Sequence, residues 1–144
     1  MVEVGPRPTS IIIKRRLLLG FIVNGVLSLD DIRLSGKRVL YRVDINSPLH
    51  PETGAFLDDG RLRSIIPTLS ALSDAKVVIL GHQSRPGRSD FTDLSGHADR
   101  ISRILGRPIR FIPDVCGEIA IDAIRSMNAG EILCLDNVRM HAEE

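Results

Sequence analysis

Polar side chains that could bind an anion follow three short apolar runs of the sequence. Asp44 and Asn46 follow the first run, in RVDINSP, His82 and Arg85 follow the second, in GHQSRPG, and Arg139 follows the last, in DNVRM. Guanidinium and imidazole groups donate hydrogen bonds to phosphate and carboxylate oxygens. If the runs are parallel strands, their carboxyl ends share one edge, where open α/β sheets bind ligands. The pattern therefore predicts a site for an anionic ligand, such as a phosphate ester.

The segment LDDGRLR places two further cations near the same edge. Arg61 and Arg63 lie at the predicted start of a helix, where backbone N–H groups and the helix dipole favour an anion. The preceding carboxylates, Asp58 and Asp59, are more typical of an N-terminal cap pair than of metal ligands. We therefore expect an anion site with no metal ligands in this chain.

Each of these residues also has a purely structural interpretation. Asp44 could cap a turn with Asn46, and His82 could be an ordinary surface histidine. These interpretations do not explain why all the groups share one edge. Signatures of other chemistries are missing from the sequence, which has no Walker-type glycine loop and no HExxH. Ser84 also lacks the G-x-S-x-G context of an esterase nucleophile.

Short runs rich in Val, Ile and Leu predict the strands that position these groups. Such runs, bounded by polar or turn-forming residues, are typical of strands. They cover residues 38–43, 76–80, 109–112 and 132–136.

Segments of helical period separate the strands and cover residues 62–72, 94–105 and 117–127. Pro67 is expected to kink the first helix or to mark a first turn, and Gly106 to end the second. The alternation predicts a Rossmann-like α/β fold, with a parallel sheet and helices on both faces.

Residues 1–26 match no element of this alternation, so we expect the domain to comprise residues 27–144. The first segment is interpreted as an extension, a disordered arm or a mis-assigned start. Its apolar stretch is interrupted by Lys14, Arg15 and Arg16, which leaves too short a run to span a bilayer. Two separated cysteines predict a reducing, cytoplasmic location, with a secretory signal as the alternative.

The composition is that of one domain with an aliphatic core. The chain has 144 residues, 43% of them hydrophobic, with four Phe, one Tyr and no Trp. Nineteen basic residues balance 18 acidic ones. We therefore expect no nucleic-acid or membrane partner, since nucleic-acid modules need a basic face and aromatic platforms. An Arg-rich nucleic-acid binder that uses the N-terminal basic cluster is the alternative.

Five collinear segments between Ser28 and Glu144 resemble the N-terminal domain of the phosphoglycerate kinase family. They read SLDDIRLSGKRVLYRVDINSPL, LDDGRLRSIIPTLSAL, KVVILGHQSRPG, ILGRPIRFIPDVCGE and GEILCLDNVRMHAEE. The HQSRPG form, followed by DFTDLSGHA, resembles the archaeal branch. The resemblance implies reversible phosphoryl transfer between ATP and 3-phosphoglycerate, giving ADP and 1,3-bisphosphoglycerate, a step of glycolysis and gluconeogenesis.

The resemblance also implies residue roles. Asp44 and Asn46 would contact the glycerate end of 3-phosphoglycerate, and Arg61 would act as the catalytic residue near the transferred phosphoryl group. Three more groups would form the basic patch that binds the substrate's own phosphate: His82, Arg85 and Arg139.

The sequence departs from the family pattern at Gly60, Asp136 and Met140, and it stops just after DNVR. We therefore expect a truncated substrate domain that is inactive without a C-terminal nucleotide-binding domain. ATP, ADP and Mg²⁺ would bind only in the complete enzyme. The alternative is a non-catalytic anion-binding remnant of the same fold. The final strand is expected to lack part of its apolar cover.

Overall fold

A computed structural model describes residues 28–141, and residues 1–26 lie outside this range. Strands and helices alternate: η1 (Leu29–Asp31), β1 (Arg38–Arg42), α1 (Gly60–Ser64), α2 (Ile66–Ala71), β2 (Lys76–Leu80), α3 (Ser95–Leu105), β3 (Arg110–Ile112), α4 (Glu118–Arg125), β4 (Ile132–Leu135) and η2 (Val138–Met140). The strands form one parallel sheet in the order β1-β2-β4-β3. The predicted parallel α/β fold is confirmed.

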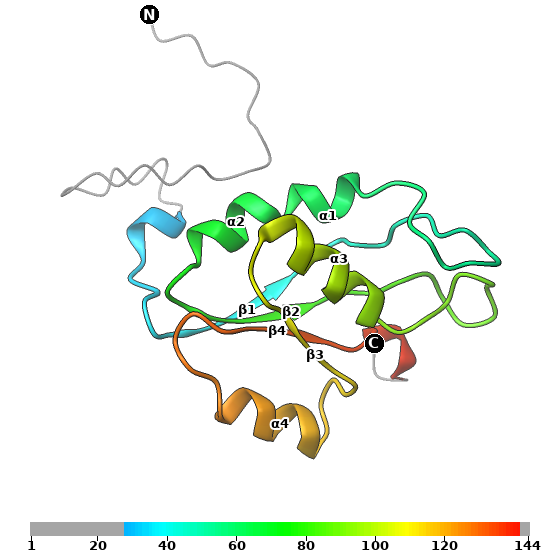
Figure 1. The fold of residues 1–144 in the computed structure, drawn as a ribbon. Helices are drawn as coiled ribbons and strands as arrows, with labels where there is room; N and C mark the ends of the chain where they lie inside the picture. Colours follow the sequence, from blue (N-terminus) through cyan, green and yellow to red (C-terminus); the bar gives the residue numbers. More distant parts are fainter. Residues whose placement is uncertain (1–27, 142–144) are drawn as a thin grey trace, which may run out of the picture.

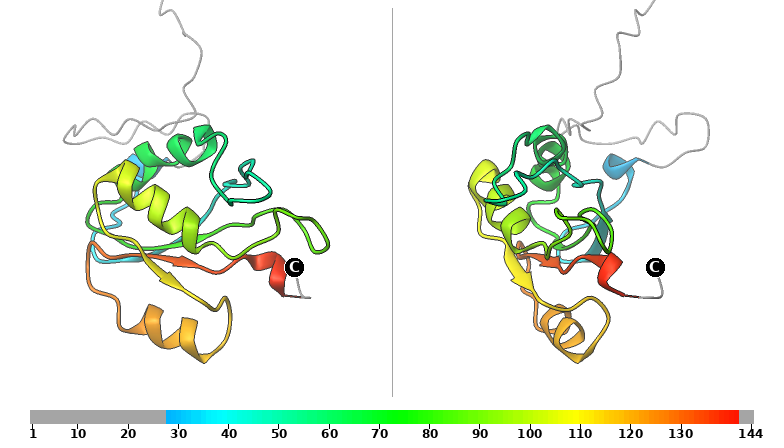
Figure 2. Two further views of the ribbon diagram at one scale, coloured as in Figure 1. Left: turned by 45° about the vertical axis from the view of Figure 1, so that its right-hand side comes forward. Right: turned by 90° about the vertical axis from the view of Figure 1, so that its right-hand side faces the viewer.

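The strand order explains which helices cover which face of the sheet. The connections from β1 to β2 and from β2 to β3 cross the sheet in one direction, whereas the connection from β3 to β4 turns back. Because such crossovers are right-handed, a reversal of direction moves the connecting helix to the opposite face. Accordingly, α1, α2 and α3 cover one face and α4 covers the other (Figures 1 and 2).

Two apolar cores result, one on each face. Val77 and Ile79 of β2 belong to the larger core, while Val78 between them belongs to the smaller core beneath α4. A strand buried on both faces needs a continuous apolar run, which is what KVVIL provides. The larger core also contains residues of the three helices or the turn before α3, all fully buried: Leu62, Leu69, Leu94 and Ile101.

The helix ends follow the predicted signals. The expected break near Pro67 separates α1 from α2, and the proline lies in the first turn of α2, where its missing N–H is not needed. Gly106 ends α3 in the left-handed conformation, with φ of 71°. Within residues 28–141, no helix is long and apolar enough to cross a membrane.

The prediction about the last strand was wrong. β4 lies between β2 and β3, and all of its residues are buried. The uncovered side belongs instead to β1, at the edge of the sheet, where Leu40 is 65% exposed. The reason is the turn back after β3, which inserts the last strand into the sheet rather than adding it at the edge.

The two thiols provide a test of this packing. Burial, aided by the charge of Asp136, raises the pKa of Cys134 in β4 to about 12, whereas Cys116 is exposed. We expect one thiol per folded chain to react quickly with an aromatic disulfide reagent, because only the thiolate attacks. Both should react in denaturant. A Cys116→Ser variant should lose the fast reaction, and fast labelling of two thiols in the native protein would contradict the buried position of β4.

Candidate functional site

Three loops at the carboxyl edge of the sheet converge on the main chain of Ser84. The Asn46 side-chain oxygen, after β1, accepts a hydrogen bond of 2.9 Å from the Ser84 N–H. Arg139, after β4, donates one of 2.7 Å to the Ser84 carbonyl oxygen. Figure 1 shows the three connections gathered at the right-hand end of the sheet. The predicted juxtaposition of Asn46, Arg139 and the His82–Arg85 segment is therefore observed.

An ion pair links the first loop to the start of α1. Arg61 donates a hydrogen bond to a carboxylate oxygen of Asp44, whose other oxygen accepts from the Asn46 N–H at 3.3 Å. Burial raises the pKa of Asp44, but the hydrogen bonds from Arg61 and Asn46 and the charges of Arg61 and His82 outweigh it, so the pKa is lowered. The Asp44 and Arg61 side chains are 63% and 50% exposed, so a ligand can reach both.

The remaining predicted cations lie on the loop after β2. His82 is partly buried, and its charge is close enough to Asp44 to lower the pKa of that carboxyl. Arg85 is exposed, and no ion pair ties its guanidinium to another of the described residues. We call the six predicted residues together the rim: Asp44, Asn46, Arg61, His82, Arg85 and Arg139. Three of its six residues are arginines, and Asp44 is the one carboxylate among the six.

Arg63 and Asp59 do not contribute to the rim. Arg63 forms two hydrogen bonds, of 2.7 and 3.0 Å, with the Asp59 carboxylate, and Arg100 of α3 adds a third of 2.7 Å. Asp59 occupies the N-cap position of α1, but its side chain makes no capping hydrogen bond. The expected cap pair is therefore only partly right. Asp59 instead ties α1 to α3.

A buried polar cluster behind the rim was not anticipated from the sequence. Gln83 is fully buried, and its amide is hydrogen-bonded to both the N–H and the carbonyl oxygen of Ser47, each at 3.0 Å. His97 and Asn137, 1% and 0% exposed, also bind to Gln83. We call Ser47, Gln83, His97 and Asn137 the hub. The available signal was His97, a polar residue on the apolar face of a helix.

Ser84 has an unusual backbone conformation at the centre of the site. Its φ is 55°, in the left-handed region that residues with a side chain adopt rarely. The Ser84 hydroxyl donates a hydrogen bond of 2.5 Å to Asp90, and Asn46 and Arg139 bind the Ser84 main chain. These contacts hold the turn that presents Arg85. Such conformations persist where the surroundings fix them, often at functional sites.

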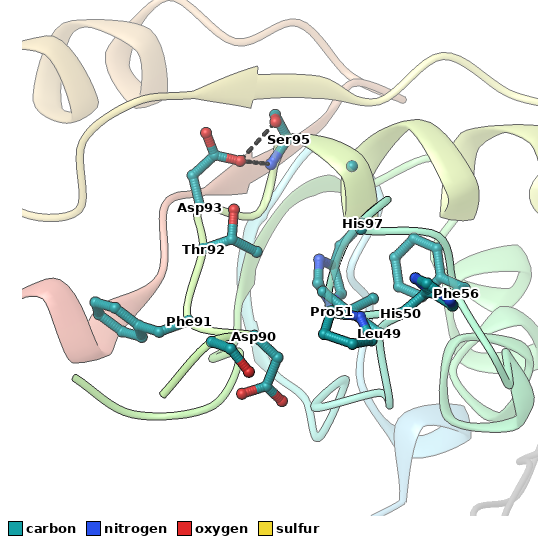
Figure 3. Close-up of a pocket in the computed structure, with 13 residues that line it drawn as sticks. Leu49, His50, Pro51, Phe56, Asp90, Phe91, Thr92, Asp93, Ser95 and His97 are labelled. Carbon is teal, nitrogen blue, oxygen red and sulfur yellow. Dashed lines mark hydrogen bonds between the residues drawn. The ribbon is translucent and has the colours of Figure 1, made fainter. Parts of the chain in front are cut away.

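A cavity of about 350 Å³ lies between residues 49–56 and 89–97 and contains none of the rim residues. His97 forms part of its wall, and its ring packs edge-on against Phe56, with centroids 4.8 Å apart (Figure 3). Asp93 accepts hydrogen bonds from the Ser95 N–H and hydroxyl at the start of α3. Among residues 28–141, no group of three or more His, Cys, Asp or Glu side chains could hold a metal ion.

Comparison with known proteins decides the family. A family model described as phosphoglycerate kinase matches residues 29–144. The chain belongs to the phosphoglycerate kinase family. It is 50% identical over 117 residues to the phosphoglycerate kinase of Methanocorpusculum labreanum, and 45% identical over 123 residues to that of Archaeoglobus fulgidus. These alignments cover 81% and 85% of this chain but only 29% and 30% of the relatives.

Solved structures agree. The crystal structure of phosphoglycerate kinase from Pyrococcus horikoshii OT3 matches with a TM-score of 0.79 at 36% identity, covering 83% of this chain and 29% of that one. The structure of phosphoglycerate kinase from Coxiella burnetii matches with a TM-score of 0.61 at 27% identity, covering 80% and 28%. The resemblance inferred from the sequence is confirmed, and the chain spans less than a third of these relatives.

The departures from the phosphoglycerate kinase pattern are compatible with the rim. Gly60 leaves Arg61 without a bulky neighbour, yet Asp44 holds the Arg61 guanidinium. Asp136 accepts hydrogen bonds from the N–H groups of Asn137 and Leu94, at 2.7 and 3.3 Å, and so links the end of β4 to the start of α3.

The close approach at Gly81 yields a stability prediction. A Cβ atom there would lie 2.8 Å from two carbons of Ile45, which is fully buried. We expect Gly81→Ala to lower the free energy of unfolding by about 1–3 kcal/mol in urea denaturation, because a packed core resists added volume. The control is Gly96→Ala in α3, where nothing lies within 4 Å, and which should be neutral or stabilising. Equal effects of the two changes would contradict the tight packing at Gly81.

The buried His97 predicts a pH dependence of stability. Burial lowers its pKa from 6.5 to about 4, although Asp93 and a hydrogen bond with the Ile45 main chain oppose this. Between these values the unfolded chain binds a proton that the folded chain does not, so acid favours unfolding. The free energy of unfolding should fall by about 3 kcal/mol as the pH drops from 6.5 to 4. Urea denaturation of the native chain and of His97→Gln isolates this contribution, because the acid dependence that comes from carboxyls with lowered pKa values, such as Asp44, is common to both and cancels in the comparison.

Proposed function

We propose that this chain binds 3-phosphoglycerate at the rim and is the substrate-binding part of a phosphoglycerate kinase. The observation that carries the proposal is the convergence of Asn46 and Arg139 on the Ser84 main chain. It holds cationic groups from separate loops at one edge of the sheet. Membership of the phosphoglycerate kinase family supports this choice of ligand.

The chemistry of the rim matches the two ends of this ligand. His82, Arg85 and Arg139 donate hydrogen bonds and positive charge, which suits the phosphate group. Asp44 and Asn46 carry oxygens that can accept a hydrogen bond from the substrate hydroxyl. Arg61, held by Asp44, faces the reacting carboxylate in this arrangement.

The proposed reaction needs little covalent chemistry from the protein. A carboxylate oxygen of 3-phosphoglycerate attacks the γ-phosphorus of ATP, and the bond from that phosphorus to the β-phosphate oxygen breaks to release ADP. Since the carboxylate is already ionised, no proton has to be removed. The protein positions the groups and neutralises charge, which is the role proposed for Arg61. Asp44 keeps Arg61 in place, so little rearrangement is needed during the reaction.

We propose that ATP and Mg²⁺ bind in the part of the relatives that this chain does not cover, so the chain alone has no kinase activity. This is supported by the coverage of 29% of the Methanocorpusculum labreanum relative.

Ligand binding by the purified chain tests the proposal. We expect 3-phosphoglycerate to cause saturable amide shifts at rim residues and to bind more tightly than inorganic phosphate, because phosphate alone cannot reach the glycerate contacts. Arg85→Gln should raise the Kd by about tenfold or more, the value of a lost charge-assisted hydrogen bond.

The matched control is Arg103→Gln, which removes an exposed Arg paired with Asp99 near the other end of α3. Its Kd for 3-phosphoglycerate should stay within about twofold of the native value, because Arg103 lies outside the rim and solvent and salt screen its charge from the ligand. Equal affinity for 3-phosphoglycerate and phosphate would favour the non-catalytic anion-binding module. No saturable shifts from a folded chain would overturn both assignments.

A further inference from the structure

The side chain of Gln83 makes a two-way connection between the loops after β1 and β2. Its amide oxygen accepts from the Ser47 N–H at 3.0 Å, and its amide nitrogen donates to the Ser47 carbonyl oxygen, also at 3.0 Å. Ser47 directly follows Asn46 of the rim, and Gln83 directly follows His82. The paired hydrogen bonds therefore fix the register of one rim loop against the other.

His97 is a further hydrogen-bond partner of that amide. Its Nε2 atom lies 3.0 Å from the Gln83 amide oxygen, which already accepts from the Ser47 N–H. Because this oxygen can only accept, Nε2 must carry the proton and donate it. A flipped amide would place an NH₂ group against two donors. His97 is 1% exposed and lies in α3, so its hydrogen bond connects the Gln83 amide to that helix.

The third loop joins through Asn137. Its side-chain nitrogen donates to the main-chain carbonyl oxygens of Gln83 and Thr92, each at 2.8 Å, and its oxygen accepts from the Arg139 N–H at 3.2 Å. Asn137 is fully buried, like Gln83. All three rim loops are thus connected through groups that do not touch solvent.

We propose that Gln83 is a positioning residue that locks the three rim loops in register, with His97 as a further hydrogen-bond partner of its amide. Its consequence for 3-phosphoglycerate rests on the function proposed above. Removal of the amide leaves the Ser47 N–H, the Ser47 carbonyl oxygen and the His97 Nε2–H without partners in a site closed to water. Such unsatisfied groups are costly, and networks of this kind act as a unit. The loops then separate, and with them Asn46, Arg85 and Arg139.

The test compares Gln83→Leu with Gln83→Glu. The leucine variant removes every hydrogen bond of the amide, including the 3.5 Å contact of its nitrogen with Asp90. The glutamate variant keeps an acceptor oxygen for the Ser47 N–H and His97, and its buried carboxyl, when protonated, can donate to the Ser47 carbonyl oxygen as the amide does. The matched control is Thr68→Val, which removes a buried hydroxyl from α2, outside the hub. The first readout is amide hydrogen exchange in the ligand-free chain, at the Ser84 and Arg139 N–H groups. Neither N–H contacts the Gln83 side chain, since they bind Asn46 and Asn137.

We expect Gln83→Leu to speed exchange at Ser84 and Arg139 by about tenfold or more, and to raise the Kd for 3-phosphoglycerate by a similar factor. Gln83→Glu should recover part of both effects. Thr68→Val should change neither by more than about twofold. If Gln83 only stabilised the fold, exchange and the Kd would change in Gln83→Leu and in Thr68→Val in proportion to the stability that each variant loses. The glutamate variant would then show no recovery.

The outcomes separate this inference from the proposed function. If the native chain does not bind 3-phosphoglycerate, the proposed function fails, and exchange at Ser84 and Arg139 still decides the role of Gln83. Native exchange rates in Gln83→Leu overturn the inference, as does an equal acceleration in Thr68→Val. If Gln83→Leu does not fold, Gln83→Met, which also lacks the amide, takes its place, and native exchange rates at both N–H groups in that variant overturn the inference.

Discussion

The site depends on a buried amide that is hydrogen-bonded to a main chain. Gln83 binds Ser47 in both directions, and Asn137 and His97 bind Gln83 in turn. The loops at the end of a parallel sheet have no ladder of their own to hold them together, because the strands that carry them have ended. The hub takes over this task beyond the last ladder hydrogen bonds. It does so with groups shielded from water, where a hydrogen bond competes less with solvent.

The order of the strands is what brings the hub together. β2 and β4 are neighbours only because the chain crosses to β3 and then returns with α4 on the opposite face. This return places the loop that carries Asn137 and Arg139 beside the loop that carries Gln83 and Ser84. The partly or fully exposed groups of the rim and the buried groups of the hub alternate along these loops. The hub therefore holds the backbone that carries the rim side chains, which is what a pre-organised binding site requires.

The charge distribution at the rim follows the same division. Asp59 pairs with Arg63 and Arg100 away from the site, and Asp44 pairs with Arg61 within it. Arg85 is left exposed on a loop whose turn is held at Ser84. An anion that enters the rim meets two arginines whose side chains are already held by hydrogen bonds, Arg61 and Arg139, so less side-chain entropy is lost on binding.

The sequence by itself determined the fold class and the strands to within one residue at each end, and it predicted the set of rim residues. Apolar runs such as KVVIL, and polar residues placed just after them, depend only on local pattern and on the common edge of parallel strands. Only the tertiary structure decided that β4 is internal, that Asp59 pairs with Arg63 and Arg100, and that Gln83 and His97 meet. These outcomes depend on strand order and on contacts between residues distant in sequence. The local pattern of apolar and polar residues reports neither strand order nor such contacts, so it does not show whether a Gln in a loop is buried or exposed.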